Sequence, residues 1–170
     1  AHGCNSLIAT RAGLALGDVV VTEAGFGADL GAEKFFDIKC RAGGLEPGAA
    51  VIVATIRALK MHGGVALPNL GTEDVDAVKR GFANLQKHIE NVRKFGVPAI
   101  VGLNQFASDT QGEIDALLGA CREMGVPVAL SNIWGKGGEG APELADIVMD
   151  TLANGEARFK PLYPSELGLK

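Results

Sequence analysis

Four short apolar runs place the tightest limit on what this chain can fold into. Each is four or five residues long, rich in β-branched side chains and almost wholly apolar. A strand with one face in water alternates apolar and polar residues, whereas a continuous apolar run is typical of a strand covered on both faces, as in a parallel sheet. The predicted strands lie at residues 19–22, 51–55, 99–103 and 126–130.

Stretches with helical periodicity separate these runs. The strongest covers residues 75–95, where apolar side chains recur every three or four positions. We expect Thr72 to be its N-cap and Gly96 to end it. A second helix is expected to begin at Thr110, which has a glutamate three positions later in the spacing of a capping box, and to stop at Gly125. Shorter helices are expected at residues 5–16, 31–41 and 142–152.

The alternation of strands and helices predicts an α/β fold with three layers, a mainly parallel sheet with helices on both faces. A chain of 170 residues and 17.6 kDa has the size of one domain. We expect residues 1–155 to form part of this α/β domain. Residues 156–170, which contain Pro161 and Pro164, are expected to be irregular and to lead into missing C-terminal sequence. The first residue is not methionine, so we interpret the chain as an internal piece of a longer protein.

Composition narrows the classes of function. The formal charge is −4, from 16 basic and 20 acidic residues, which leaves no basic excess to bind a nucleic-acid backbone. The longest apolar run is far shorter than the roughly 18 residues that a membrane helix needs, and no signal peptide is visible. The cysteines Cys4, Cys40 and Cys121 lie too far apart for a zinc motif or a disulfide framework, so we expect reduced thiols in the cytoplasm.

Unusual polar and glycine-rich segments follow the end of each predicted strand. In a parallel sheet all the carboxyl ends lie at one edge, where ligands bind. Four such loops therefore predict a single site at that edge. The loops cover residues 23–31, 57–64, 104–109 and 131–140.

Two of these loops carry glycine patterns. Gly25 and Gly27 match the first two glycines of the dinucleotide-binding pattern G-x-G-x-x-G, but Gly31 comes one position late for the third. The alternative is a turn with no role in binding. The chain has no G-x-x-x-x-G-K-[ST] phosphate loop. Residues 135–140 place Lys136 among glycines, which suits either an anion site built from backbone N–H groups or a flexible solvated loop.

The strand-end loops also contain isolated aromatic and amide side chains. Phe106 and Trp134 could pack in the core, or their flat faces could hold a planar heterocycle between them. Asn104 could bind the edge of such a ring or could cap a turn.

Other polar residues fit an anion. His2, Asn5 and Ser6 lie where a helix is expected to begin, a position that suits either an anion or simple N-capping. Arg57 and Lys60 share one helical face and could contact phosphate or carboxylate, or form surface ion pairs. No catalytic triad or metal-ligand motif is present, so the residues that would bind a metal are not identified.

Residues 53–64, with the sequence VATIRALKMHGG, resemble the signature segment of formate–tetrahydrofolate ligase, also called formyltetrahydrofolate synthetase. Residues 1–6, 22–35, 82–98 and 134–140 are also similar to that family. The resemblance covers essentially the whole chain, and the twelve-residue match is far more specific than the glycine patterns.

The resemblance implies an ATP-dependent enzyme of one-carbon metabolism. Such enzymes phosphorylate formate with MgATP, and N10 of tetrahydrofolate then attacks formyl phosphate, giving 10-formyltetrahydrofolate, ADP and phosphate. The family fold is similar to that of P-loop NTPases, so residues 1–155 would be part of a nucleotide- and folate-binding domain. Family members are typically homotetramers activated by a monovalent cation.

The resemblance also implies roles for residues. Phe106 and Trp134 match the aromatics that enclose the pterin, while Phe26 and Asp29 would lie beside the reacting centre. The side that faces the nucleotide would consist of Asn104, Lys136, Gly137 and Gly138.

The family's phosphate-binding loop lies upstream of this chain, so we expect the isolated polypeptide to be inactive. One alternative belongs to another class of enzyme: a nicotinamide-dependent oxidoreductase domain that uses the turn between Gly25 and Gly31.

Overall fold

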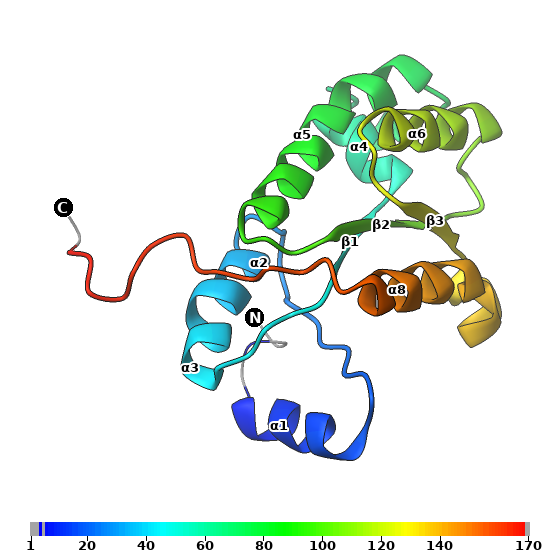
Figure 1. Ribbon diagram of the computed structural model, residues 1–170. Helices are drawn as coiled ribbons and strands as arrows, with labels where there is room; N and C mark the ends of the chain where they lie inside the picture. Colours follow the sequence, from blue (N-terminus) through cyan, green and yellow to red (C-terminus); the bar gives the residue numbers. More distant parts are fainter. Residues whose placement is uncertain (1–3, 5, 169–170) are drawn as a thin grey trace.

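A sheet of three parallel strands forms the centre of the protein. The computed structural model describes residue 4 and residues 6–168, apart from the side chain of Trp134. The strand order is β1-β2-β3, with Val51 of β1 opposite Ile100 of β2, and Val101 of β2 opposite Val128 of β3 (Figure 1). The central strand is buried along nearly its whole length, as its apolar sequence predicted. The strands are β1 (Ala50–Ala54), β2 (Ala99–Asn104) and β3 (Val128–Ser131).

Helices lie on both faces of this sheet, although Val51 and Val53 of the edge strand β1 remain exposed on one face. Figure 1 shows α4, α5 and α6 on one face and α8 on the other, so the described part of the chain has the expected three layers. Ile52 and Ala54 of β1 and Leu103 of β2 lie in the core with apolar residues of α4, α5 and α6. The helices are α4 (Ile56–His62), α5 (Val75–Lys94), α6 (Gln111–Glu123) and α8 (Pro142–Asn154).

The N-terminal part of the chain is mostly helical. After α1 (Leu7–Leu16), a single helical segment comprises α2 (Gly31–Lys34), the π-helical turn η2 (Phe35–Cys40) and α3 (Arg41–Gly43). Gly44, with φ of 60°, follows the last turn in the left-handed conformation that glycine adopts easily.

An aromatic cluster joins this helical segment to the core. The ring centroids of Phe36 and Phe95 lie 4.8 Å apart, and those of Phe36 and Phe159 lie 5.7 Å apart. Residues 156–168 contain no helix or strand, yet Phe159 anchors them through this cluster.

Two details of the predicted secondary structure are wrong. Residues 19–22 are extended but form no strand, because no neighbouring strand pairs with them in the described part of the chain, and Val21 is 88% exposed. The N-cap of α5 is Asp74, whose carboxylate accepts a hydrogen bond of 2.8 Å from the Ala77 N–H. Thr72 lies before the helix, and its carbonyl accepts a hydrogen bond from Lys60 instead.

Candidate functional site at the carboxyl ends of the strands

The loops that follow β2 and β3 lie side by side. Asn104 is paired with Ser131 in the parallel register, and the Gln105 N–H donates a hydrogen bond of 3.0 Å to the Ser131 carbonyl just beyond the ladder. Phe106 and Trp134 therefore belong to segments that leave the sheet at neighbouring points. This is the arrangement that the strand-end argument predicted for these two loops.

A tight turn holds Phe106 at this edge. Its N–H donates to the Asp109 carboxylate at 2.9 Å, and the Asp109 N–H donates to the Phe106 carbonyl at 3.0 Å. The Phe106 side chain is 39% exposed, so it is not a core residue of this chain. Asn104, the last residue of β2, is half-buried.

The loop after β3 is closed at both ends. Asn132 caps α7 (Ile133–Lys136) by accepting a hydrogen bond of 3.2 Å from the Gly135 N–H, and its own N–H donates to the Gly140 carbonyl at 2.9 Å. The 3₁₀ turn η4 (Gly137–Gly140) follows. Lys136, Gly137 and Gly138 are all exposed, whereas the Trp134 side chain lies outside the described residues.

The second loop begins α4, and here one interpretation needs correction. Arg57 is exposed in the first turn, as an anion-binding residue would be. Lys60 is only 1% exposed, and its ammonium lies 2.7 Å from the Glu113 carboxylate. Lys60 thus forms a buried ion pair with α6 rather than an anion site or a surface pair.

The Glu113 carboxylate accepts further hydrogen bonds beside its ion pair with Lys60. Besides Lys60, its carboxylate accepts hydrogen bonds from the Asp74 N–H at 2.9 Å and the Thr110 N–H at 3.2 Å. Burial by itself raises the pKa of Glu113, but the hydrogen bonds from Lys60, Asp74 and Thr110 outweigh burial and hold the pKa below its usual value. Glu113 therefore carries a negative charge in the folded protein at neutral pH.

Asp109 has the opposite shift. Burial raises its pKa above the usual value, and the neighbouring Glu113 charge adds to the rise. The hydrogen bond from Phe106 and the positive charges of Lys60 and Arg57 oppose it. One of the Asp109 carboxylate oxygens, Oδ1, is buried without a hydrogen-bond partner.

The first loop is not preceded by a strand, because residues 19–22 have none to pair with. The strand-turn-helix context of a dinucleotide site is therefore missing in the described structure, which leaves the oxidoreductase alternative without support. The turn is closed by hydrogen bonds from the Leu30 and Gly31 N–H groups to the Gly27 carbonyl, at 3.0 and 2.8 Å. Asp29 in this turn is exposed.

Phe26 is strained. With φ of 72°, it is the only non-glycine residue with positive φ among those that the structure describes, and its side chain is 74% exposed. A left-handed conformation costs a residue with a β-carbon on the order of 1 kcal/mol or more, and such outliers gather at functional sites.

We expect Phe26→Gly to raise the free energy of unfolding by up to about 1 kcal/mol, because glycine adopts positive φ without strain and the exposed ring contributes little burial. Phe26→Ala keeps the β-carbon and is the matched control, which should not stabilise. Urea unfolding of the two variants beside wild type measures this. Equal stability of the glycine and alanine variants would show that the turn carries no strain.

The N-terminal anion candidates are only partly described. His2 and Asn5 lie outside the described residues. The Ser6 hydroxyl accepts a hydrogen bond of 3.1 Å from the Ala9 N–H and so caps α1, in agreement with the simpler of the two interpretations.

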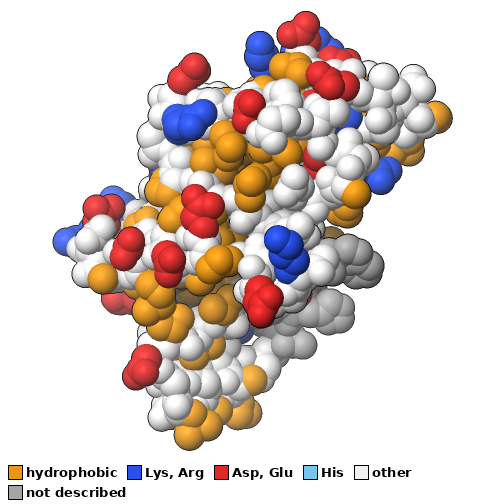
Figure 2. Space-filling view, turned by 90° about the vertical axis from the view of Figure 1, so that its right-hand side faces the viewer, with side chains coloured by type: hydrophobic (Ala, Val, Ile, Leu, Met, Phe, Trp, Pro, Cys, Tyr) orange, Lys and Arg blue, Asp and Glu red, His pale blue; other side chains and the backbone are white. Residues whose placement is uncertain are grey.

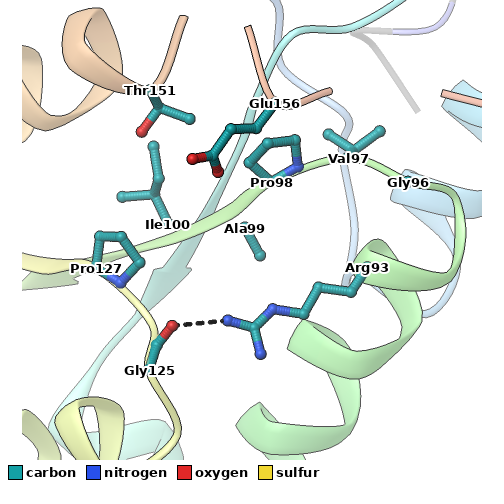
Figure 3. A pocket seen from close by; sticks show the side chains of 10 residues that line it. All are labelled: Arg93, Gly96, Val97, Pro98, Ala99, Ile100, Gly125, Pro127, Thr151 and Glu156. Atoms are coloured by element: carbon teal, nitrogen blue, oxygen red, sulfur yellow. Dashed lines mark hydrogen bonds between the residues drawn. The ribbon is translucent and has the colours of Figure 1, made fainter. Parts of the chain in front are cut away.

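Two hollows in the described part of the structure lie away from these loops. One, of about 360 Å³, opens at the amino ends of β2 and β3, where Arg93 reaches across to the Gly125 carbonyl and Glu156 lies opposite (Figure 3). Another, also about 360 Å³, follows the outer edge of β3 beside α8. The side of the molecule on which β2 and β3 end instead presents an open face with hydrophobic side chains gathered between charged ones (Figure 2).

Comparison with known proteins identifies the family. The sequence model of the family described as formate–tetrahydrofolate ligase matches residues 1–170. This chain belongs to the formate–tetrahydrofolate ligase family. A curated formate–tetrahydrofolate ligase of Granulibacter bethesdensis is 63% identical over 169 residues, which are 99% of this chain and 30% of that protein. The chain thus spans about a third of the length of this relative.

The sequence did not reveal the roles of Glu113 and Asp109, the two acidic residues that support the strand-end loops of this ligase-family chain. Glu113 was visible only as the partner of Thr110 in the capping box, which the structure confirms. Nothing in the local pattern showed that the Glu113 carboxylate also forms an ion pair with Lys60, which lies far earlier in the chain. Asp109 was seen only as the end of a polar loop.

Three further observations concern the cysteines, the metal-ligating side chains and the helices of this chain. All three cysteines are free, and burial raises the pKa of both Cys40 and Cys121 to about 11, so these thiols stay protonated at neutral pH. Within the described residues, no three His, Cys, Asp or Glu side chains gather as they would around a metal ion. No helix of the described residues is long and apolar enough to cross a membrane.

Proposed function

We propose that this chain is an internal part of a formate–tetrahydrofolate ligase and supplies the folate slot and part of the nucleotide site. Residues 1–155 would belong to a nucleotide- and folate-binding domain with a P-loop NTPase-like fold, and residues 156–170 would lead into the next part of the polypeptide. Family membership over the whole chain supports this proposal. We further propose a cytoplasmic location, from the spacing of the cysteines, and a homotetramer, from the family resemblance.

The observation that carries the folate slot is the junction of the loops after β2 and β3. The 3.0 Å hydrogen bond from Gln105 to Ser131 ties the segment of Phe106 to the segment of Trp134. A planar pterin between two aromatic side chains gains contact area on both faces. The partial exposure of Phe106 supports a role in binding, because that ring still has a free face in this chain.

The reaction asks the protein mainly for charge neutralisation and positioning. ATP phosphorylates formate, and N10 of tetrahydrofolate attacks the acyl carbon of formyl phosphate, with phosphate as the leaving group. Lys136 would place an ammonium beside the nucleotide phosphates, and the open backbone at Gly137 and Gly138 would allow close approach. Asn104 would face the nucleotide from the end of β2.

Phe26 and Asp29 would flank the reacting centre. The positive φ of Phe26 supports this, since strain of this kind is retained where a side chain must be held in one place. The candidates for anion contacts remain His2, Asn5, Ser6 and Arg57. Of the two whose structure is described, Ser6 and Arg57, only Arg57 carries a positive charge, and it is exposed.

The proposed nucleotide brings Mg²⁺, and family resemblance adds a monovalent cation. The described residues contain no group of three His, Cys, Asp or Glu side chains that could hold a metal ion by themselves, so no residue of this chain is assigned to either ion. Bound magnesium would supply charge neutralisation on the phosphates.

We expect Phe106→Ala in the complete ligase to raise the KM for tetrahydrofolate about tenfold, since stacking on one aromatic face is worth about 1–3 kcal/mol. The KM values for ATP and formate should change little. Met149→Ala is the control, because Met149 is 53% exposed in the second half of α8 and belongs to neither loop. Initial rates of 10-formyltetrahydrofolate formation give all three constants. An unchanged KM for tetrahydrofolate in Phe106→Ala would end the proposal of a folate slot at this edge.

A further inference from the structure

The turn of residues 106–109 is built around the Asp109 side chain. Its carboxylate accepts the Phe106 N–H at 2.9 Å, while the backbone closes the same turn from the Asp109 N–H to the Phe106 carbonyl at 3.0 Å. These two bonds fix the backbone from which the Phe106 ring projects. Ala107 and Ser108, between these two residues, are exposed.

The other end of the turn is fixed as well. Thr110, the next residue, caps α6 and is held by Glu113 in the capping box. Glu113 is in turn held by Lys60 of α4 and by the Asp74 N–H at the start of α5. Asp109 therefore joins a rigid buried support to a partly exposed aromatic ring.

We propose that Asp109 is a positioning residue for tetrahydrofolate: through its hydrogen bond to the Phe106 N–H, it holds the Phe106 ring where the pterin stacks. This inference rests on the proposed function. The buried Oδ1 atom has no partner, and the groups around the carboxylate are Arg57 and Lys60 of α4 and Glu113 of α6. What the turn uses is the position of the accepting oxygen rather than the charge, since the amide oxygen of asparagine can accept the same hydrogen bond from the Phe106 N–H.

Two variants separate position from charge. Asp109→Asn keeps the accepting oxygen in place and removes the charge, so the KM for tetrahydrofolate should stay within about threefold of wild type. Asp109→Glu keeps the charge but moves the carboxylate by one methylene, so the KM should rise about fivefold or more. In both variants kcat and the KM for ATP should stay near wild type. Asp115→Ala is the matched control, because Asp115 is exposed on α6, where its carboxylate accepts a hydrogen bond of 2.8 Å from the Gln111 side chain.

A double-mutant cycle tests whether Asp109 acts through Phe106. If it does, Asp109→Glu should add little to the effect of Phe106→Ala on the KM for tetrahydrofolate. Additive effects on this KM would overturn the inference. So would a raised KM in Asp109→Asn together with a normal KM in Asp109→Glu. A loss of kcat and of all substrate affinities together would show a purely structural role and would also overturn it. If Phe106→Ala has no effect on this KM, the proposed folate slot fails, independently of Asp109.

Discussion

Replacing Lys60 by methionine lowers the free energy of unfolding by about 3–5 kcal/mol, the usual cost of leaving one member of a buried ion pair without its partner. The two side chains are 1% and 0% exposed, so water cannot replace the lost ammonium. The variant leaves the Glu113 carboxylate buried beside two backbone N–H donors only, and it also removes the donor to the Thr72 carbonyl. Glu113→Gln should be destabilising for the same reason, because it leaves the Lys60 charge unpaired.

The loss of the pair should also be visible as a change in pH dependence. The pKa of Glu113 is held below its usual value in the folded state, so its contribution to stability is present above the unfolded pKa of about 4.3. That contribution is lost as the pH falls below this value and through the lower folded-state pKa. Glu113→Gln should remove this part of the acid dependence, which urea unfolding at a series of pH values would measure.

An exposed ion pair provides the control. Lys87 and Glu90 lie 3.3 Å apart on the surface of α5, with 62% and 39% of their side chains exposed. Lys87→Met should leave the unfolding midpoint of the complete ligase unchanged within error, because exposed pairs contribute little. Equal effects of Lys60→Met and Lys87→Met would contradict the idea that burial makes the inner pair important.

The second large effect is expected at the contact between α4 and α5. A β-carbon added at Gly81 would lie 1.8 Å from the Leu59 carbonyl oxygen, and one added at Gly63 would lie 2.0 Å from the Ala77 carbonyl oxygen. Both obstacles are backbone atoms, so no side-chain rotation can relieve the clash. We expect Gly81→Ala to destabilise by about 3 kcal/mol or more, since the helices must separate and the core must follow.

Gly119 on α6 is the matched control for Gly81. It is also in a helix, but a β-carbon there meets nothing within 4 Å. Gly119→Ala should therefore stabilise by up to about 1 kcal/mol through helix propensity. Thermal unfolding of the two variants beside wild type should move the midpoint in opposite directions. A Gly81→Ala variant as stable as wild type would show that α4 and α5 do not pack this closely.

Local chemistry made much of the fold predictable. The runs at 51–55, 99–103 and 126–130 coincide closely with β1, β2 and β3. Burial on both faces holds for the central strand β2, whereas Val51 and Val53 of β1 are exposed on one face. The capping box at Thr110 is also confirmed, since its two hydrogen bonds involve residues three positions apart. Strand order along the chain was enough to bring the loop of Phe106 beside the loop of Trp134.

The strand that was predicted at residues 19–22 fails because a strand needs a partner distant in sequence. Residues 19–22 have the composition of a strand, but a strand exists only through hydrogen bonds to a neighbour, and the described chain provides none for them. The N-cap of α5 is Asp74 rather than Thr72, and here the deciding bond is local, because the Asp74 carboxylate accepts from the Ala77 N–H three positions later.

The sequence by itself determined the α/β class, the positions of three strands and the edge at which the aromatic loops meet. These depend on periodicity and capping, which act over a few residues. Only the tertiary structure decided that Lys60 is buried against Glu113, that Asp109 supports the Phe106 turn with one oxygen left unpartnered, and that Phe26 is strained. Burial and charge pairing are properties of residues brought together from separate elements, and no local pattern encodes them.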